Sequence, residues 1–277
     1  MFIPHHVLVQ AEQQPAPSRV LVVLHGIYGR GGNWRAFARK LCERRPDWGV
    51  LLVDLRMHGS SHGAPAPHSV QACAEDVLAL LEGGEARATE YAILGHSFGG
   101  KVALDMRRIA REQDRSLGDL WIIDSSPSSR PGAMGDPANT VVAVLRTLGE
   151  LPLHFAKRDD FVDAVVERGY PRGLALWLAM NLSPTEAGYQ NTLSVDAMTQ
   201  LLRDYFDRDL WSELEAGGKA IHFVRASKGS TITPEDERRL QTLAADAPVH
   251  VYELPGSHWL HVDALEELVA LVAGGLP

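Results

Sequence analysis

The stretch 95–101, GHSFGGK, contains residue types that could do chemistry in two different ways. Around Ser97 its spacing is G-x-S-x-G, which is typical of a nucleophilic serine on a tight turn between a strand and a helix. From Gly95 to Lys101 its spacing is G-x-x-x-x-G-K, which is typical of a phosphate-binding loop. That loop needs a Ser or Thr after the lysine to hold Mg²⁺, and this chain has Val102. The stretch therefore favours a serine nucleophile, with Lys101 in a structural role.

The geometry of the turn explains why glycine flanks Ser97 on both sides. A sharp turn from a strand into a helix holds the serine in a strained backbone conformation. The residues two before and two after it then approach other backbone too closely for a Cβ atom, and Gly95 and Gly99 occupy these positions. The apolar run 91–94 predicts the strand, and the run 102–106 predicts the helix. We expect the Ser97 hydroxyl to project above the sheet.

A nucleophilic serine needs a base, because a hydroxyl group is essentially never ionised near neutral pH. Among the twelve histidines of the chain, His258 follows a predicted strand and precedes the last predicted helix, in the stretch ELPGSHWLHVD. The nucleophile comes first and the histidine last, each at the carboxyl end of a strand, which predicts His258 as the base. His261 is the local competitor, and its place at the start of the helix indicates a structural role.

The negative charge that develops during acyl transfer needs N–H donors aimed at it. The backbone N–H of Phe98 follows the serine directly and lies at a predicted helix N-terminus. The second candidate is the backbone N–H of Ile27, in the loop after the apolar run of LVVLHGIYG. The pair His25-Gly26 suits a loop whose amide points into a pocket. Its alternative interpretation is an ordinary turn between a strand and a helix.

These residues need a scaffold, and the chain alternates short β-branched runs with helical patterns, which predicts βαβ units and a mostly parallel sheet. The predicted strands are HVLVQ, RVLVVLHG, GVLLVDLR, YAILGHS, DLWIIDSS, AIHFVRAS and VHVYELPG, and the predicted helices between them cover 33–44, 70–81, 98–111, 234–245 and 262–272. Between residues 127 and 217 the alternation stops, and only helical patterns remain. We therefore expect an α/β core of residues 1–126 and 218–277 with an inserted, all-helical cap at 127–217.

Composition narrows the classes of partner. A chain of 277 residues with 45% hydrophobic content can bury a large core, and its net charge of −8 argues against a nucleic-acid groove. Cys42 and Cys73 lie far apart and signal neither a disulfide framework nor a zinc site. The N-terminal stretch shows no signal-peptide pattern, and no apolar run is long enough to span a bilayer. We expect a cytoplasmic monomer or homodimer with no membrane span and no nucleic-acid partner.

Metal or cofactor chemistry has little support in the sequence. His58 and His62 are four residues apart, but the intervening Gly-Ser-Ser argues against the helix that would align them as ligands. We expect neither a metal ion nor a cofactor.

The motifs LHGIYG, DLRMHGSS, GHSFGGK and PGSHWLHVD, in this order and spacing, resemble the α/β-hydrolase superfamily, specifically its cytosolic serine esterases with a helical cap. The resemblance covers about residues 19–126 and 218–275. It implies an α/β-hydrolase fold with Ser97 as nucleophile and His258 as base. It further implies that the oxyanion donors are the backbone N–H groups of the two residues named above, 27 and 98.

Asp54 and Arg56 match a D-x-R-x-H-G-x-S turn that in the family shapes the core beneath the site, so we expect both to be structural. The sequence departs from the family pattern in its acid. Many members carry an aspartate after the strand that returns from the cap, but here that segment is VRASKGSTITP. Some members take the acid one strand earlier, where this chain has Asp124. We predict Asp124 as the acid that orients the histidine, with Glu235 or Asp236 as the alternative acids. The structural alternative for Asp124 is a role in capping a turn.

A serine at this turn excludes the epoxide hydrolysis and dehalogenation that use an aspartate nucleophile on the same fold. We expect the substrate to be a carboxylic ester or thioester with a short to medium acyl chain. Tyr28, Trp177 and Trp259 are the predicted walls of an apolar substrate pocket, although apolar residues of the cap could equally form its own core. C–C bond hydrolysis, cofactor-free perhydrolysis and a non-hydrolytic small-molecule receptor that retains the triad stay open as alternatives.

Overall fold

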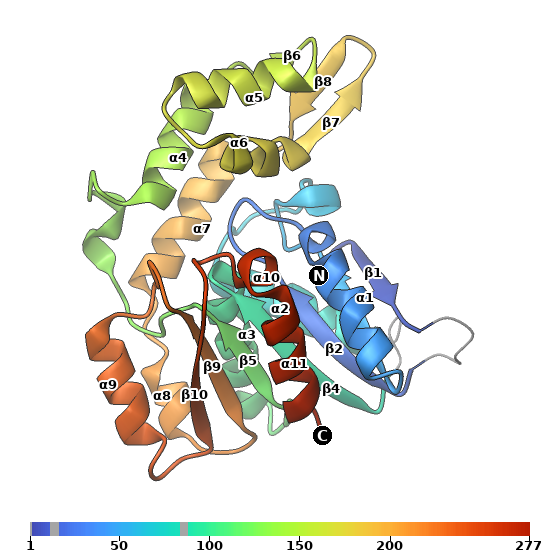
Figure 1. The fold of residues 1–277 in the computed structure, drawn as a ribbon, viewed down its shortest axis with the longest axis vertical. Helices are drawn as coiled ribbons and strands as arrows, with labels where there is room; N and C mark the ends of the chain where they lie inside the picture. The colour runs from blue at the N-terminus through green and yellow to red at the C-terminus, as the bar shows by residue number, and fades with distance from the viewer. Residues whose placement is uncertain (1, 12–16, 84–87) are drawn as a thin grey trace.

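The computed structural model describes residues 2–11, 17–83 and 88–277. The strands of its larger sheet are β1 (His6–Val9), β2 (Arg19–Leu24), β3 (Trp48–Val53), β4 (Glu90–His96), β5 (Leu120–Ile123), β9 (Ile221–Ala226) and β10 (Val249–Leu254). Within the described residues this sheet has seven strands in the order β1-β3-β2-β4-β5-β9-β10 (Figure 1). All neighbouring strands run parallel except β1 and β3. The predicted α/β class with a mostly parallel sheet is confirmed.

Helices cover both faces of this sheet. They are α1 (Arg35–Arg44), α2 (Val70–Glu82), α3 (Phe98–Glu112), α9 (Pro234–Leu243), α10 (Leu260–Asp263) and α11 (Leu265–Gly275). Successive residues of a strand point to opposite faces. Accordingly, Val22 of β2 packs with α2 and α3, whereas Val23 packs with α1 and α11. This two-sided burial explains why the strands are continuous apolar runs.

The chain between β5 and β9 forms a separate set of elements. These are α4 (Thr140–Glu150), β6 (His154–Phe155), α5 (Arg158–Glu167), α6 (Arg172–Leu178), β7 (Leu182–Thr185), β8 (Gly188–Asn191), α7 (Val195–Asp207) and α8 (Trp211–Glu215). Figure 1 shows α4, α5, α6 and the short strands above the core, with α7 descending from them towards the central sheet.

The prediction that this insertion is all-helical is wrong, because β6, β8 and β7 form a small antiparallel sheet. Two features hide it in the sequence. One strand has only two residues, and another contains Pro184, which normally argues against a strand. The proline is tolerated because β7 lies at the edge of this sheet. Gly188 begins the returning strand with φ +130°, and a Cβ atom there would lie 2.3 Å from the carbonyl oxygen of Phe155.

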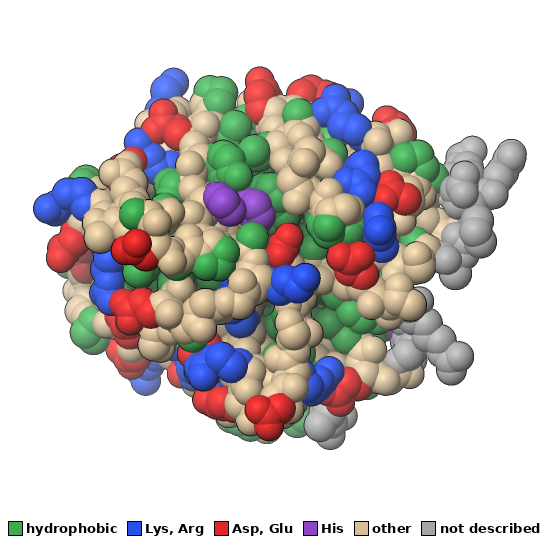
Figure 2. All heavy atoms as spheres, turned by 90° about the horizontal axis from the view of Figure 1, so that it is seen from below, with side chains coloured by type: hydrophobic (Ala, Val, Ile, Leu, Met, Phe, Trp, Pro, Cys, Tyr) green, Lys and Arg blue, Asp and Glu red, His purple; other side chains and the backbone are tan. Residues whose placement is uncertain are grey.

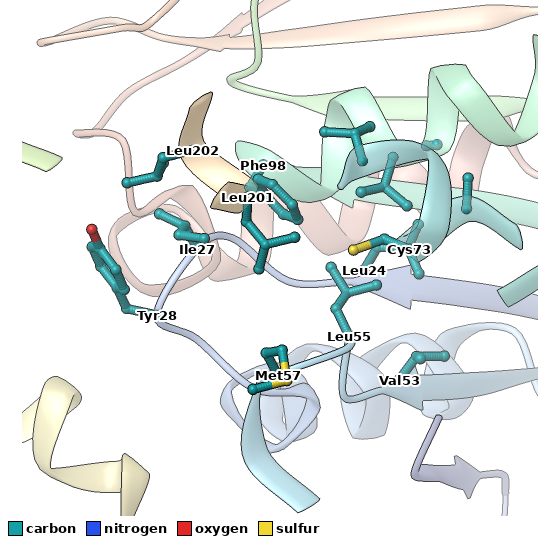
Figure 3. Close-up of a cluster of buried hydrophobic side chains, with 14 of the residues drawn as sticks. Leu24, Ile27, Tyr28, Val53, Leu55, Met57, Cys73, Phe98, Leu201 and Leu202 are labelled. Atoms are coloured by element: carbon teal, nitrogen blue, oxygen red, sulfur yellow. The ribbon is translucent and has the colours of Figure 1, made fainter. Parts of the chain in front are cut away.

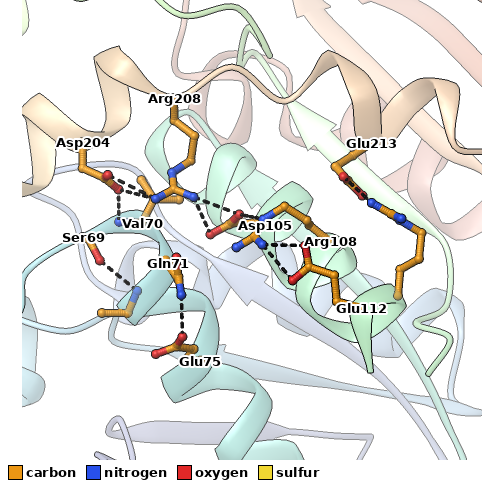
Figure 4. A network of polar contacts seen from close by, with 12 residues as sticks. Ser69, Val70, Gln71, Glu75, Asp105, Arg108, Glu112, Asp204, Arg208 and Glu213 are labelled. Atoms are coloured by element: carbon orange, nitrogen blue, oxygen red, sulfur yellow. Dashed lines mark hydrogen bonds and ion pairs between the residues drawn. The ribbon is translucent and has the colours of Figure 1, made fainter. Parts of the chain in front are cut away.

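An ion pair fastens the end of α7 to the core helix α3, and a hydrogen bond fastens α7 to α2 (Figure 4). Arg208, just after α7, donates to both oxygens of the buried Asp105 in α3, at 3.1 and 3.2 Å. Its other Nη atom donates to Asp204, one turn earlier, whose carboxylate accepts the backbone N–H of Val70 at 2.7 Å. The insertion is therefore fixed to the helix that begins directly after Ser97.

Lys101 makes a second connection between α3 and the end of α7. Its Nζ atom donates to the backbone carbonyls of Ser128, Tyr205 and Arg208, at 2.8, 2.7 and 2.7 Å. Burial lowers the pKa of Lys101 to about 7, while three carbonyl acceptors favour the ammonium form, which alone carries three N–H groups. Lys101 is structural, as predicted, although its partners are carbonyl groups rather than a carboxylate. It is not available to a phosphate group.

The charges on the visible surface agree with the acidic composition of the sequence, which argues against a nucleic-acid groove. Figure 2 shows the molecule from below, and on that face acidic and basic side chains are interspersed with apolar ones. Within the described residues of this face, no continuous basic stripe is visible.

None of the described helices combines the length and the hydropathy that a membrane crossing requires. Cys42 and Cys73 are free and buried.

We expect Lys101→Met to lower the free energy of unfolding by roughly 2–4 kcal/mol, because three buried carbonyl groups lose their donor while the volume of the side chain is kept. Urea unfolding followed by circular dichroism measures this change. Lys228→Met, at an exposed position, is the matched control and should leave the midpoint unchanged. Equal stability of the two variants would show that the Lys101 contacts contribute nothing.

Candidate active site

Ser97 lies on the turn between β4 and α3, with φ 52° and ψ −116°. This is a conformation that residues other than glycine rarely adopt, and it costs roughly 1–3 kcal/mol. The flanking glycines are required as predicted. A Cβ atom on Gly95 would lie 2.2 Å from the carbonyl oxygen of Gly99, and one on Gly99 would lie 2.3 Å from that of Leu24. The turn therefore works only with glycine at both positions.

Asp124 and His258 meet at the carboxyl edge of the sheet. Nδ1 of His258 donates to Oδ2 of Asp124 at 2.6 Å, although the two residues are 134 positions apart. Asp124 directly follows β5, has a left-handed backbone with φ 45°, and is fully buried. The structure thus joins the predicted base to the first of the predicted acids.

The segment that lacks an acid in the sequence supplies hydrogen-bond donors to Asp124. Its carboxylate accepts the backbone N–H of Ala226 at 2.9 Å, the hydroxyl of Ser230, and the backbone N–H of Thr231 at 3.2 Å. Burial raises the pKa of Asp124, but the hydrogen bonds from His258, Ala226 and Ser230 outweigh it and lower the pKa below its ordinary value. The carboxylate is therefore ionised and held in a fixed orientation.

The alternative acids lie elsewhere. Asp236 is buried at the start of α9, where it forms a capping box with Thr233 and accepts the hydroxyl of Ser126 at 2.8 Å. Glu235 is exposed. Within the part of the chain that the structure describes, neither carboxylate has a hydrogen bond to His258.

His96 connects the serine turn to the histidine loop, a contact that the sequence did not reveal. Its Nε2 atom donates to the backbone carbonyl of His258 at 2.9 Å, and the two rings lie 4.7 Å apart. The only sequence signal is its place directly before Ser97. Within the described residues Ser97 Oγ has no hydrogen bond, to His258 or to any other group, and the side chain is buried. His261 is buried and stacks on Trp34 at 4.5 Å, which agrees with its expected structural role.

The loop after β2 lies against the serine turn. A Cβ atom on Gly26 would lie 3.4 Å from the Cβ atom of Ser97. The next residue is Ile27, and its backbone N–H has no hydrogen-bond partner within the described residues. Phe98 is the first residue of α3, where a backbone N–H precedes the helical hydrogen-bond ladder. Both predicted N–H donors therefore lack a hydrogen-bond partner within the described residues, and their role in binding an oxyanion stays a prediction.

Two buried histidines hold this loop. His25 donates from Nδ1 to the carbonyl of Gly26 at 2.8 Å, and its Nε2 accepts the N–H of Leu55 at 3.0 Å. His58 donates from Nδ1 to a backbone carbonyl in the same way, and its Nε2 accepts the N–H of Tyr28 at 3.2 Å. Burial lowers the pKa of both, that of His58 to about 3. With both ring nitrogens engaged, neither is free to bind a metal ion.

Asp54 and Arg56 are structural, as expected. Asp54 accepts the backbone N–H groups of Gly31 at 2.7 Å and Ser60 at 2.8 Å, and so ties the loop after β2 to the loop after β3. Arg56 forms a buried two-point ion pair with Asp76, at 2.8 and 2.9 Å. A search of the described residues for clusters of potential metal ligands finds none.

The predicted pocket residues lie at the border between the core and the insertion. Trp177 of α6 meets Trp259, the neighbour of His258, with ring centroids 4.5 Å apart. The Tyr28 hydroxyl donates to the carbonyl of Val141 in α4 at 3.0 Å. Figure 3 shows Tyr28 and Ile27 in the buried cluster that also includes Phe98, Leu201 and Leu202. Contact with a substrate stays a prediction for all three pocket residues.

Comparison with known proteins adds independent evidence. The model of the alpha/beta hydrolase family matches residues 21–271. The "sn-1-specific diacylglycerol lipase ABHD11" of Xenopus tropicalis is 26% identical over 263 residues, which cover 92% of this chain and 76% of that protein. A "Putative esterase/lipase" of Haemophilus influenzae is 31% identical over 120 residues, 43% of this chain and 39% of that protein. The solved structure of "Marine microorganism esterase" has a TM-score of 0.81 at 20% identity and covers 100% of both chains, which shows the shared fold.

The lowered pKa of Asp124 predicts a pH dependence of stability. Because the folded carboxyl binds its proton more weakly than the unfolded one, Asp124 stabilises the fold above about pH 4 and loses this effect as the pH falls further. We expect the unfolding free energy of the wild type to fall more steeply on acidification than that of Asp124→Asn. Urea unfolding at a series of pH values measures both, with Glu235→Gln as the exposed control. Parallel curves for wild type and Asp124→Asn would contradict the lowered pKa of Asp124.

Proposed function

The chain belongs to the alpha/beta hydrolase family, and from that membership we propose that it is a serine hydrolase of carboxylic esters, or of thioesters, with short to medium acyl chains. The observation that carries the proposal is the 2.6 Å hydrogen bond between Asp124 and His258, beside the strained turn that presents Ser97. A buried carboxylate that fixes the tautomer of a histidine is what a serine nucleophile needs in order to be activated.

In the proposed mechanism, the Ser97 oxygen attacks the carbonyl carbon of the ester, and Nε2 of His258 takes the hydroxyl proton. The imidazolium that forms is stabilised by the ionised Asp124 at Nδ1. The same proton then passes to the leaving alkoxide of an ester, or thiolate of a thioester, which departs as an alcohol or a thiol and leaves an acyl group on the serine. A water molecule activated by the histidine releases the acid and restores the free serine.

The negative oxygen of each tetrahedral intermediate is proposed to accept the backbone N–H groups of Ile27 and Phe98. Two facts support this role. Both amides are unused by the fold, and the loop that carries Ile27 lies against the serine turn. Donors that are already oriented stabilise the developing charge without a reorganisation cost.

Residues 127–217 are proposed to form a cap, with residues 1–126 and 218–277 as the hydrolase core. The contact between Trp177 and Trp259 supports this role, because it brings α6 next to the histidine loop. Tyr28, Trp177 and Trp259 would then face the acyl chain. The names of the relatives, a diacylglycerol lipase and an esterase, support an ester as the substrate class.

Ser97→Ala is expected to lower kcat by roughly 10⁴-fold or more, because the nucleophile is lost. The measurement is hydrolysis of p-nitrophenyl esters and acyl thioesters of graded chain length by wild type and variant. Activity that survives the substitution would refute the mechanism. A wild type that reacts with a serine-directed phosphonate but turns over no ester would indicate a receptor that retains the triad.

Asp124→Asn is expected to lower kcat by roughly 10³- to 10⁴-fold with KM close to that of the wild type, because the asparagine favours the wrong histidine tautomer. Steady-state kinetics with one good ester decide this. Asp236→Asn serves as the comparison, since this buried carboxylate lies outside the site. A larger loss in Asp236→Asn than in Asp124→Asn would move the acid to α9.

A further inference from the structure

Tyr28 has a backbone conformation that its side chain disfavours. Its φ angle is 62°, in the left-handed region that residues with a Cβ atom rarely enter. It occupies the third position of the four-residue turn 26–29, which the hydrogen bond from the N–H of Gly29 to the carbonyl of Gly26 closes at 3.0 Å. Glycine is the usual residue at a left-handed third position of a turn. Some other contact must therefore hold Tyr28 in place.

Three hydrogen bonds hold Tyr28, and two of them come from the insertion. On the core side, His58 accepts its backbone N–H at 3.2 Å. From the insertion, Asn181 donates from Nδ2 to its backbone carbonyl at 2.7 Å. The carbonyl of Val141 accepts its hydroxyl at 3.0 Å. The backbone N–H and the backbone carbonyl of the left-handed Tyr28 are thus both hydrogen-bonded.

Asn181 is itself fixed. It is 3% exposed, and its Nδ2 atom also donates to the carbonyl of Leu178 at 3.2 Å. Two carbonyl acceptors determine which end of the amide faces Tyr28, since only the NH₂ group can donate to both. The backbone carbonyl of Asn181 accepts the N–H and the hydroxyl of Thr192, at 3.1 and 2.8 Å. The amide is therefore a rigid support.

The two ends of the loop are held by hydrogen bonds. His25 accepts the N–H of Leu55, and the N–H of Gly31 is bound by Asp54 at 2.7 Å. If Tyr28 relaxed to a negative φ, the compensating rotations would therefore fall on residues 26, 27, 29 and 30. Rotations at residues 26 and 27 would turn the backbone N–H of Ile27 away from the serine.

We propose that Asn181 is a positioning residue of the hydrolytic reaction: by holding the carbonyl of left-handed Tyr28, it aims the N–H of Ile27 at the oxyanion. This inference rests on the proposed function. It makes the insertion part of the catalytic geometry, because the oxyanion loop has its working shape only while residues 179–181 lie on it.

Asn181→Leu tests the role, because leucine has a similar volume and cannot donate. We expect kcat for a short p-nitrophenyl ester to fall roughly 10- to 100-fold, with KM within about twofold of wild type, since an oxyanion donor acts on the transition state. Affinity for an alkyl trifluoromethyl ketone, whose adduct with Ser97 carries the oxyanion, should fall by the same factor as kcat/KM. A support with a purely structural role would lower the melting temperature or raise KM and leave kcat unchanged.

Asn191→Leu is the matched control. It makes the same substitution at a buried position of the insertion whose amide accepts the N–H of Leu193 at 3.1 Å and leaves the amide of Asn181 on Tyr28, so kcat should stay within about twofold of wild type. An active wild type whose kcat is unchanged by Asn181→Leu overturns the proposal, as does an equal loss in both variants. A wild type that hydrolyses no ester overturns the proposed function, and with it any role of Asn181 in that reaction.

Discussion

A buried negative charge at the carboxyl edge of the sheet is the constraint on which the site depends. Asp124 has no contact with solvent, so its carboxylate is stable only while protein donors surround it. Those donors come from the end of β9, from Ser230 and Thr231, and from His258. A second carboxylate in the segment 227–231 would face this charge at close range. The absence of an acid after β9 therefore goes together with the presence of Asp124 after β5, because the loop after β9 supplies hydrogen-bond donors to that carboxylate.

The insertion contacts both sides of the serine turn. On one side, Lys101 and Arg208 fasten the end of α7 to α3, the helix that begins after Ser97. On the other side, Asn181 contacts the loop after β2 through Tyr28. The Lys101 contacts use backbone carbonyl groups of the insertion. Arg208 and Asn181 act through their side chains, so the geometry depends on these two residues as well as on where the elements lie.

Sequence reasoning succeeded where the determinants are local. The apolar strands, the glycines around Ser97 and the place of His258 after a strand all follow from short patterns. The choice of Asp124 as the first candidate to contact His258 came from the resemblance to the family. It failed where a residue acts through partners far away in the chain. His96 looks like the last residue of a strand and His58 like an ordinary loop residue until folding brings their partners to them. The small sheet of the insertion was missed because its strands are short and one contains a proline.

The insertion leaves the sheet after β5 and returns to it at β9, and these two strands are neighbours. Their pairing from Leu120 to Ile123 is complete without any residue of the segment between them. In evolutionary terms, this junction permits the distal elements α5, α6 and the β7–β8 hairpin to be lengthened, shortened or exchanged without opening a gap in the sheet. Conservation would then be expected at the anchoring end of α7 and at the turn that touches Tyr28, whereas the distal elements are free to diverge with the substrate.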